Sequence, residues 1–473
     1  MRRNTFCDTA ACGCLASSTL RETWPFSPFN PSWSGDRVHL EVRRTAGAGG
    51  GAAWAGTVMG ALALVIALAL LVAPRGPQAS NRHTVEVVYA STAALRHVLD
   101  ASDVQLVRDV PPLRLAELRP AGDPRDFIAS LKRQQGIVDA RLTVARSRAG
   151  NPALTLGLLS TPAGGAYEWQ WYATGVDRVS SSVLAAAARM TIAVVDTGAD
   201  VTAPGLAAKV KGSYDVRSGA RVADDQDGHG TFVASLAAGS TAGGGGVAGF
   251  GGAARLLVVK VGDGTHVTDF DVAAGIVYAV QRGARVVNVS IAGKTRSAAE
   301  ASAVAYAARR GALVVAAVGN DAQAGNPAEY PAALLESEGS NGVGSVGLAV
   351  GASDMQGHRA AFSEHGAFVS LAAPGTAVFG AVSRNAQVSA FPRVSIPGIS
   401  NGSYGFASGT SYAAPQVSGA AALVWAVNPR LSSREVATIL KQTASGGGVW
   451  TPDLGFGVIN VAAAVDAAAR TTQ

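Results

Sequence analysis

Short, continuously apolar runs alternate with longer helix-like segments from about residue 167 to the end of the chain. Such runs are typical of strands buried on both faces, and helices between them serve as crossovers. The pattern therefore predicts an α/β domain with a mostly parallel central sheet between two layers of helices. The predicted strands are residues 190–195, 255–261, 284–291, 312–317 and 345–351, and the clearest helices are 269–282, 298–310, 433–443 and 461–470.

The predicted helix 298–310 carries signals at both ends. Ser297 and Glu300 have the spacing of a capping box, in which each side chain bonds the backbone N–H of the other residue. Gly311 follows the last helical residue, where glycine commonly ends a helix. We therefore expect Glu300 to cap this helix.

Residues 84–145 show a separate α+β pattern. Strand-like segments at 85–90 and 137–144, and two more around Pro111-Pro112, accompany two short helices, the second beginning after Asp123. Two helices among four strands predict a small ferredoxin-like sandwich. A unit of about sixty residues is marginal alone, so we expect it to dock on a partner surface. Residues 146–166, rich in Gly, Pro, Ala and Leu, are predicted to be a linker before a main domain at 167–473.

The N-terminal region has its own organisation. Residues 1–51 are predicted to be a basic leader, and residues 52–74 hold an apolar core that is either a signal peptide or a membrane anchor. Both interpretations stay open, because the core is short for a span and lacks a clear small-x-small cleavage site. A leader of this length is unusual for either, which suggests a downstream start codon. Initiation at Val38 would leave a short basic segment before the apolar core.

Composition narrows the function classes. Hydrophobic residues make up 48% and charged residues 15% of the 473, which suits a large buried core. The net charge of +6 comes from residues 1–150, with 18 basic and 12 acidic residues, whereas residues 151–473 hold 21 of each. The main domain thus offers no electrostatic case for binding nucleic acid. All three cysteines lie within the first 14 residues, without a fourth ligand at zinc-like spacing.

One serine stands at the start of an apolar, helix-like run. Ser411 follows Gly409-Thr410, and Pro415 comes early enough in the helix to be tolerated. The N-terminus of a helix presents unpaired N–H groups and a positive dipole end, which favour a developing anion. A serine there can be a simple cap or a nucleophile, so the choice depends on the rest of the chain.

Three further segments supply the groups that a serine nucleophile needs. Asp196 ends a predicted strand, where functional groups gather in parallel sheets. His229 opens a helix and has glycines on both sides, which allow close approach to another backbone. Asn320 follows Gly319 at the end of another strand and can donate its amide N–H to an oxyanion.

Together these motifs resemble the subtilisin-like serine proteases, the subtilases, over roughly residues 167–470. The order Asp196, His229, Ser411 is that of subtilisin, with Asn320 between the last two. Residues 287–293, 362–366, 372–375 and 455–460 also resemble family segments. Phe232 and Tyr412 depart from common subtilisin residues, but neither supplies a catalytic atom.

The resemblance implies a subtilisin-like fold and a serine endopeptidase. It gives Ser411 as nucleophile, His229 as general base, Asp196 as its partner and Asn320 as oxyanion donor. The residues implied to bind substrate are Ser290, Ile291, Ala292, Gly293 and Gly319.

The resemblance also extends to partners and location. Residues 84–145 would be a propeptide that assists folding and blocks the active site until it is cut, so the partners are polypeptide substrates and the chain's own propeptide. Activity is expected outside the cytoplasmic membrane, membrane-anchored through residues 52–74 or secreted. No cofactor or metal is predicted; the family often binds calcium, but no site can be assigned.

Two alternatives belong to other classes. A catalytically inactive subtilase fold that binds peptides or acts as a scaffold is disfavoured because all four catalytic positions are intact. An esterase is disfavoured because the nucleophile lies in Gly409-Thr410-Ser411-Tyr412 rather than Gly-x-Ser-x-Gly.

Two expectations concern the peptide bond that is cut. Residues 290–293 and the strand before Asn320 hold no acidic residue, which predicts an apolar side chain before the scissile bond. The chain's own processing is expected between Arg146 and Ala166, a window that contains four leucines.

Overall fold

The computed structural model describes residues 84–148, 167–240, 248–264, 266–336, 346–386, 390–394 and 403–471. The small N-terminal unit has the predicted ferredoxin-like arrangement: a four-stranded antiparallel sheet in the order β2-β3-β1-β4, with two helices. Asp123 caps the second helix as expected, and Ser91 caps the first. The elements are β1 (Val85–Tyr89), α2 (Thr92–Ala101), β2 (Val104–Val110), β3 (Leu115–Pro120), α3 (Pro124–Leu131) and β4 (Ile137–Leu142).

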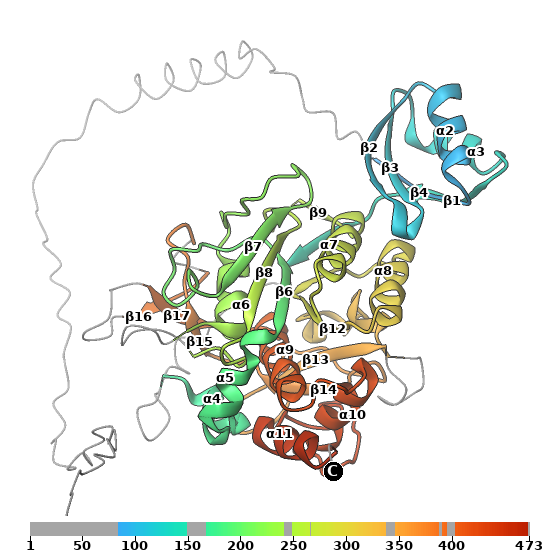
Figure 1. The fold of residues 1–473 in the computed structure, drawn as a ribbon. Helices are drawn as coiled ribbons and strands as arrows, with labels where there is room; N and C mark the ends of the chain where they lie inside the picture. Colours follow the sequence, from blue (N-terminus) through green and yellow to red (C-terminus); the bar gives the residue numbers. More distant parts are fainter. Residues whose placement is uncertain are drawn as a thin grey trace, which may run out of the picture. The chain divides into compact units, whose positions relative to one another are not determined.

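The main domain is built on a seven-stranded sheet in the order β14-β13-β12-β10-β6-β8-β7, and all neighbouring pairs are parallel (Figure 1). The predicted parallel sheet is confirmed, although its outer strands β7 and β14 were not foreseen. The strands are β6 (Thr191–Asp196), β7 (Val210–Asp215), β8 (Arg255–Lys260), β10 (Val286–Val289), β12 (Leu313–Ala317), β13 (Gly347–Ser353) and β14 (Leu371–Pro374).

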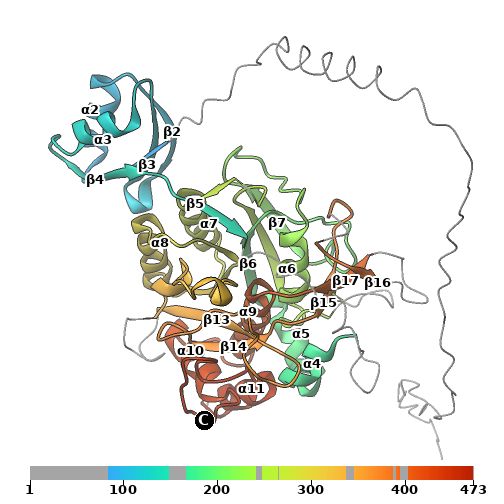
Figure 2. The ribbon, with the colours of Figure 1, turned by 180° about the vertical axis from the view of Figure 1, so that it is seen from behind.

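Two helical layers cover the sheet. Successive residues of a strand point to opposite faces, so Ile192 and Val194 pack on one side and Ala193 and Val195 on the other. The first side carries α6 and α9, and the second carries α7 and α8 (Figures 1 and 2). The helices are α6 (His229–Ala238), α7 (Asp269–Gln281), α8 (Ala298–Arg309) and α9 (Thr410–Val427).

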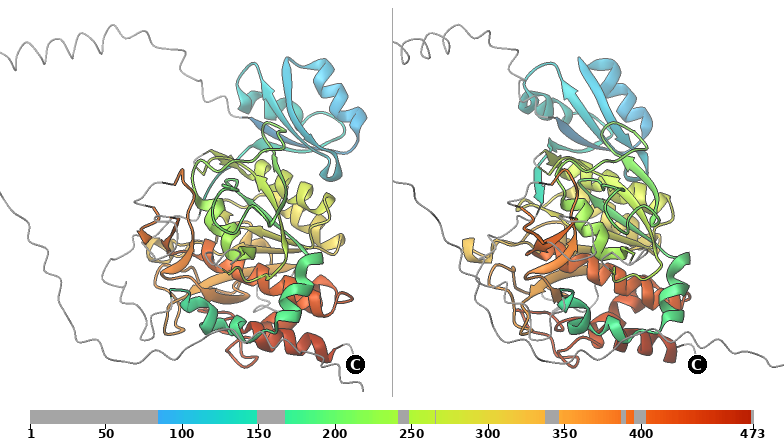
Figure 3. Two further views of the ribbon diagram at one scale, coloured as in Figure 1. Left: turned by 60° about the vertical axis from the view of Figure 1, so that its left-hand side comes forward. Right: turned by 90° about the vertical axis from the view of Figure 1, so that its left-hand side faces the viewer.

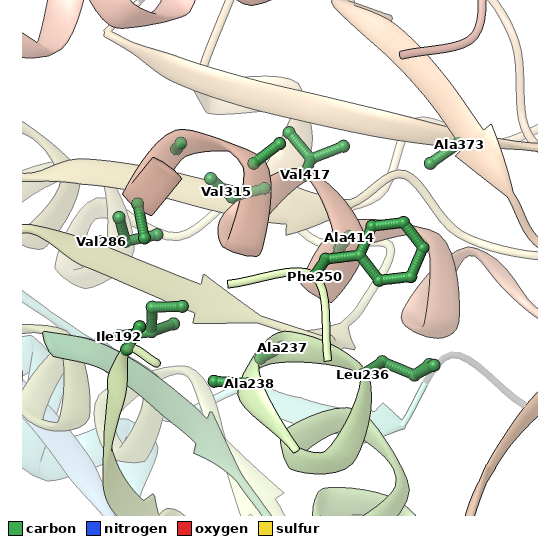
Figure 4. Packing of buried hydrophobic residues seen from close by; sticks show 14 of the residues in the cluster. Ile192, Leu236, Ala237, Ala238, Phe250, Val286, Val315, Ala373, Ala414 and Val417 are labelled. Carbon is green, nitrogen blue, oxygen red and sulfur yellow. The ribbon is translucent and has the colours of Figure 1, made fainter. Parts of the chain in front are cut away.

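Helix α9 is central to the first layer, and nearly all its residues are buried. Close packing is possible because small residues face the sheet and α6. In Figure 4, Ala414 and Val417 of α9 lie among Ile192, Val286 and Val315 of the strands, with Phe250 and α6 nearby. This packing fixes the start of α9, and therefore Ser411, against the ends of the central strands.

The remaining elements complete the main domain. A small antiparallel sheet in the order β15-β17-β16 lies outside the main one. Helices α10 and α11 pack on α9 and on each other near the C-terminus (Figure 3). These elements are α4 (Trp169–Thr174), α5 (Ser181–Ala186), β15 (Val378–Ala381), β16 (Arg393–Val394), β17 (Tyr404–Ala407), α10 (Ser433–Gln442) and α11 (Val461–Arg470).

One strand changes the predicted boundary between unit and linker. Residues 145–148 were divided between the two, but they form strand β5 (Ala145–Arg148). This strand pairs antiparallel with β11 (Ile291–Ala292) on one side and with β9 (Val267–Thr268) on the other. The expected linker therefore begins with an ordered segment bound to the main domain.

Residues 1–83 and most of the predicted linker, residues 149–166, lie outside the described residues. The predicted leader and the apolar core at 52–74 are therefore not described. Among the described residues, no helix combines the length and the hydropathy needed to cross a membrane.

Candidate active site

Three adjacent strands deliver three of the predicted site residues to one edge of the sheet. Strand β10 lies between β6 and β12, and all three run parallel. Asp196 is the last residue of β6, Ser290 follows β10, and Asn320 lies three residues beyond β12. The carboxyl ends of neighbouring parallel strands thus place these side chains together.

His229 begins helix α6 and faces Asp196. Its Nδ1 lies 2.7 Å from Asp196 Oδ1, and both side chains are fully buried. The flanking glycines explain the approach: Gly228 has a φ of 97°, and a Cβ on Gly230 would collide with the carbonyl oxygen of Gly198. The expected role of these glycines is confirmed.

Asp225, which the sequence argument did not single out, ties the two loops together. Its carboxylate accepts hydrogen bonds from the backbone N–H groups of Gly228 and Thr231, both at 2.8 Å, and from the hydroxyl of Thr197 at 2.9 Å. Thr197 in turn accepts from the N–H of Gly230 at 2.9 Å. The loop after β6 and the start of α6 therefore hold each other. The sequence signal for Asp225 is limited to its position four residues before His229.

The electrostatics of His229 suit a base. Burial disfavours the charged imidazolium, but the Asp196 carboxylate and its hydrogen bond outweigh burial, so the pKa of His229 is raised above its ordinary value. Asp227 contributes in the same direction, whereas Arg148 opposes it. The second ring nitrogen, Nε2, is buried without a hydrogen-bond partner within the described residues.

This raised pKa predicts the acid limb of the pH profile. A protonated His229 cannot accept a proton, so kcat/KM should fall roughly tenfold per pH unit below an apparent pKa above the ordinary value of about 6.5. The measurement is kcat/KM against pH with an uncharged peptide. Activity that persists undiminished to pH 5 would contradict this assignment.

Ser411 is fixed from two sides at the start of α9. Gly409 precedes the helix with a φ of 152°, and a Cβ there would lie 3.4 Å from Asn320 Nδ2. Pro415 has no N–H, so it cannot give the helical hydrogen bond to the carbonyl of Ser411. The hydroxyl of Ser290 donates to that carbonyl instead, at 2.9 Å.

A buried polar chain supports Ser290. Ser418 donates to Asn288 Oδ1 at 2.9 Å, and Asn288 Nδ2 donates to Ser290 Oγ at 3.0 Å. The hydroxyl of Ser411 itself donates to the carbonyl of Ser290 at 3.2 Å. Next to Ser411, the ring of Tyr412 lies 5.5 Å from the ring of His229, between centroids, so the serine and histidine segments meet here.

The amide of Asn320 is oriented by the residue before Ser411. Its Oδ1 accepts from the N–H of Thr410 at 2.9 Å and from its hydroxyl at 3.1 Å. These two bonds fix the orientation of the amide, with its oxygen toward Thr410. The segments that carry Asp196, His229, Asn320 and Ser411 therefore meet at this edge of the sheet.

The five predicted substrate-binding residues lie beside these groups. Ile291 and Ala292 form β11, which pairs with Arg148 and Ser147 of β5. Gly293 is also held from the other side, by a backbone bridge to Tyr330. A short peptide strand is thus already seated along the predicted binding segment.

Two acidic side chains approach Gly319 from other parts of the chain. A Cβ on Gly319 would lie 2.5 Å from a carboxylate oxygen of Glu364 and 2.7 Å from one of Glu329. Burial first, and then the charges of Glu329 and Asp321, raise the pKa of Glu364 to about 9. Burial first, and then the charge of Asp321, raises the pKa of Glu329 to about 7. Both glutamates come from segments outside the two that the sequence argument considered. The apolar preference before the scissile bond, which was drawn from those two segments alone, stays a prediction.

No group of three or more His, Cys, Asp or Glu side chains within the described ranges could hold a metal ion. Comparison with known proteins decides the family. The model described as "Subtilase family" matches residues 188–458, more than half of the chain.

This chain belongs to the subtilase family.

Curated subtilases agree with this assignment. The chain is 36% identical over 238 residues to thermitase of Thermoactinomyces vulgaris, covering 49% of this chain and 74% of the relative. It is 35% identical over 275 residues to subtilisin BL of Lederbergia lenta, covering 58% and 89%. The family match and these relatives together identify the chain as a subtilisin-like serine endopeptidase.

A solved subtilase structure supports the fold. Fervidolysin of Fervidobacterium pennivorans, a keratinolytic enzyme related to subtilisin, aligns with a TM-score of 0.68 at 24% identity. The alignment covers 81% of this chain and 61% of fervidolysin. The predicted subtilisin-like fold is confirmed.

Proposed function

We propose that this subtilase cleaves peptide bonds through an Asp196–His229–Ser411 triad with Asn320 as an oxyanion donor. The observation that carries the proposal is the 2.7 Å contact of buried His229 with Asp196, at the edge of the sheet where Ser411 lies in the first turn of α9. The Asp225 network links the Asp196 and His229 segments, and hydrogen bonds of Thr410 and Ser290 link Asn320 and Ser411 to their neighbours, as a preorganised site requires.

The proposed reaction uses only these groups. Ser411 Oγ attacks the carbonyl carbon while its proton passes to His229 Nε2, and Asp196 stabilises the imidazolium. The developing oxyanion accepts from the backbone N–H of Ser411 and from Asn320 Nδ2. The C–N bond breaks as His229 returns the proton to the leaving amine. Water, activated by His229, then hydrolyses the acyl-enzyme and restores Ser411.

Active-site labelling tests this function. A fluorophosphonate should label the wild-type enzyme at Ser411, and the Ser411→Ala variant should not be labelled. Ser182→Ala, at an exposed position of α5, is a matched control and should label fully. A folded wild-type protein that takes no label and cleaves no peptide would instead support the inactive peptide-binding alternative.

The small unit fits a propeptide role. Arg108 Nη1 lies 2.6 Å from Asp271 Oδ1, and the N–H of Val144 donates to Asp269 Oδ1 at 2.8 Å, so the unit docks on the first turn of α7. Strand β5 then lies between β11 and β9, where a substrate strand would pair. We infer that residues 84–148 keep the enzyme inactive until the chain is cut.

The strand register points to the position of that cut. Arg148 pairs with Ile291 and Ser147 with Ala292, and one further step of this antiparallel pairing would bring residue 149 opposite Ser290. The Ser411 hydroxyl contacts the carbonyl of Ser290. We therefore propose cleavage after residue 149, which lies within the predicted window and before its leucines.

We further propose that the mature enzyme acts outside the cytoplasmic membrane, either anchored through residues 52–74 or secreted. One curated relative, at 35% identity over 257 residues, is named a cell wall-associated protease of Bacillus subtilis, which supports this location.

A further inference from the structure

Strand β5 carries two arginines whose side chains are held by carboxylates of the main domain. Arg146 and Arg148 are two residues apart, so they leave the strand on the same side. In the proposed register they stand at the fourth and second positions before the scissile bond, P4 and P2. Each therefore probes the pocket that a substrate side chain would enter at that position.

Arg146 fills a closed acidic pocket. Its Nε and Nη2 donate to Glu300 Oε1 and Oε2, both at 2.8 Å, and Nη2 also donates to the carbonyl of Thr295 at 2.9 Å. Both side chains of the pair are fully buried. This two-pronged geometry fits the planar guanidinium, whereas a lysine ammonium could satisfy only part of it.

This pairing overturns the predicted capping box. Ser297 accepts from the N–H of Glu300 at 3.2 Å, as expected, but the Glu300 carboxylate is bonded to Arg146 rather than returned to the helix start. Asp269 adds a second negative charge that favours the cation at Arg146. The pocket is thus acidic because of residues that belong to the main domain.

The pocket would need a new cation once β5 leaves. Glu300 is at the start of α8 and stays with the enzyme, where burial already raises its pKa to about 6 even with Arg146 beside it. A buried carboxylate without a partner is unfavourable, and an apolar substrate side chain would leave it so. An arginine in the same position restores the pair.

A second, more open acidic group faces Arg148. Its Nη1 lies 2.8 Å from Asp227 Oδ1, two residues before His229, with side-chain exposures of 30% and 11%. A more exposed pair is screened by water, so it should discriminate less strongly than the Glu300 pocket. Either a lysine ammonium or an arginine guanidinium could pair with Asp227 at this position.

We propose that the mature enzyme selects polypeptides with arginine at P4 and a basic residue at P2, as in its own segment Ala145-Arg146-Ser147-Arg148. This inference rests on the proposed protease function and its cleavage register. The competing explanation is that both arginines serve only to dock the small unit and that substrates need neither.

Peptide kinetics with the processed wild-type enzyme decide between these explanations. The substrates are quenched fluorescent peptides that follow residues 145–151, with P4 as Arg, Lys, Leu or Ala and P2 as Arg, Lys or Ala. Changing P4 from Arg to Leu should lower kcat/KM about ten- to hundredfold, with Lys intermediate, and changing P2 to Ala should have a smaller effect. Equal rates with Leu and Arg at P4 would overturn the inference.

A variant links the preference to the pocket. Glu300→Gln should lose most of the discrimination between Arg and Leu at P4 while keeping that at P2. Glu435→Gln, an exposed glutamate on α10, is the matched control and should keep both preferences. If Glu300→Gln retains the full P4 preference, the pocket assignment is wrong; if it does not mature, the wild-type profile alone decides.

Active-site titration separates the two levels of the proposal. If the enzyme is labelled by a fluorophosphonate but cleaves peptides at equal rates whatever the P4 residue, the protease function is supported and the proposed P4 preference is wrong. If the enzyme is neither labelled nor able to cleave any of the peptides, both the protease function and the proposed P4 preference are wrong.

Discussion

Replacing Ser411 by alanine is expected to lower kcat roughly 10⁶-fold and to leave the chain uncut. The alanine removes the nucleophile but keeps the backbone N–H at the start of α9. Wild type should lose its first 149 residues, as the register of β5 on β11 indicates. The intact masses of both proteins, expressed in a protease-poor host, are the measurement.

Each departure from this result has a definite meaning. Equal processing of wild type and Ser411→Ala would show that another protease makes the cut. An active wild-type enzyme that stays full length would show that residues 84–148 are a permanent domain. A cut well beyond residue 149, among the leucines, would show that the register of β5 does not set the cleavage position.

Replacing Asn320 by alanine is expected to lower kcat about 10²–10³-fold with little change in KM, the magnitude found for the corresponding donor of a subtilisin. The side chain should contact the carbonyl oxygen mainly when that oxygen becomes negative, so its loss affects the transition state more than the bound substrate. Steady-state kinetics on a peptide with arginine at P4 provide both constants.

The control for this variant addresses the neighbouring loop. Asn320 Oδ1 also accepts two hydrogen bonds from Thr410, so the alanine could shift Ser411 indirectly. Unchanged fluorophosphonate stoichiometry would show that the nucleophile is intact. A rise in KM with kcat preserved would instead assign Asn320 to ground-state binding.

Features encoded locally could be predicted from the sequence. Asp196, His229 and Asn320 stand at strand ends or helix starts, and these boundaries follow from apolar runs and glycines. The parallel order of the strands then brings them together. The helix cap of the small unit at Asp123 was predictable for the same reason.

Contacts between distant segments could not be predicted in this way. Glu300 has the spacing of a capping box, but Arg146, 154 residues earlier, competes for its carboxylate and forms two charge-assisted bonds. Glu329 and Glu364 reach Gly319 from separate loops, and strand β5 exists only because β11 and β9 offer it partners. No local pattern contains these pairings.

Pro415 has a consequence for how this site can vary in evolution. Because Pro415 has no N–H, it cannot give the Ser411 carbonyl the usual helical hydrogen bond. The hydroxyl of Ser290, which is 125 residues before Pro415 in the chain, donates to that carbonyl instead. A lineage that loses the Ser290 hydroxyl while keeping the proline leaves that buried carbonyl without its donor, whereas a lineage that replaces the proline regains a helical N–H. The two positions are therefore epistatic, and the order in which they change decides which intermediates retain a well-placed nucleophile.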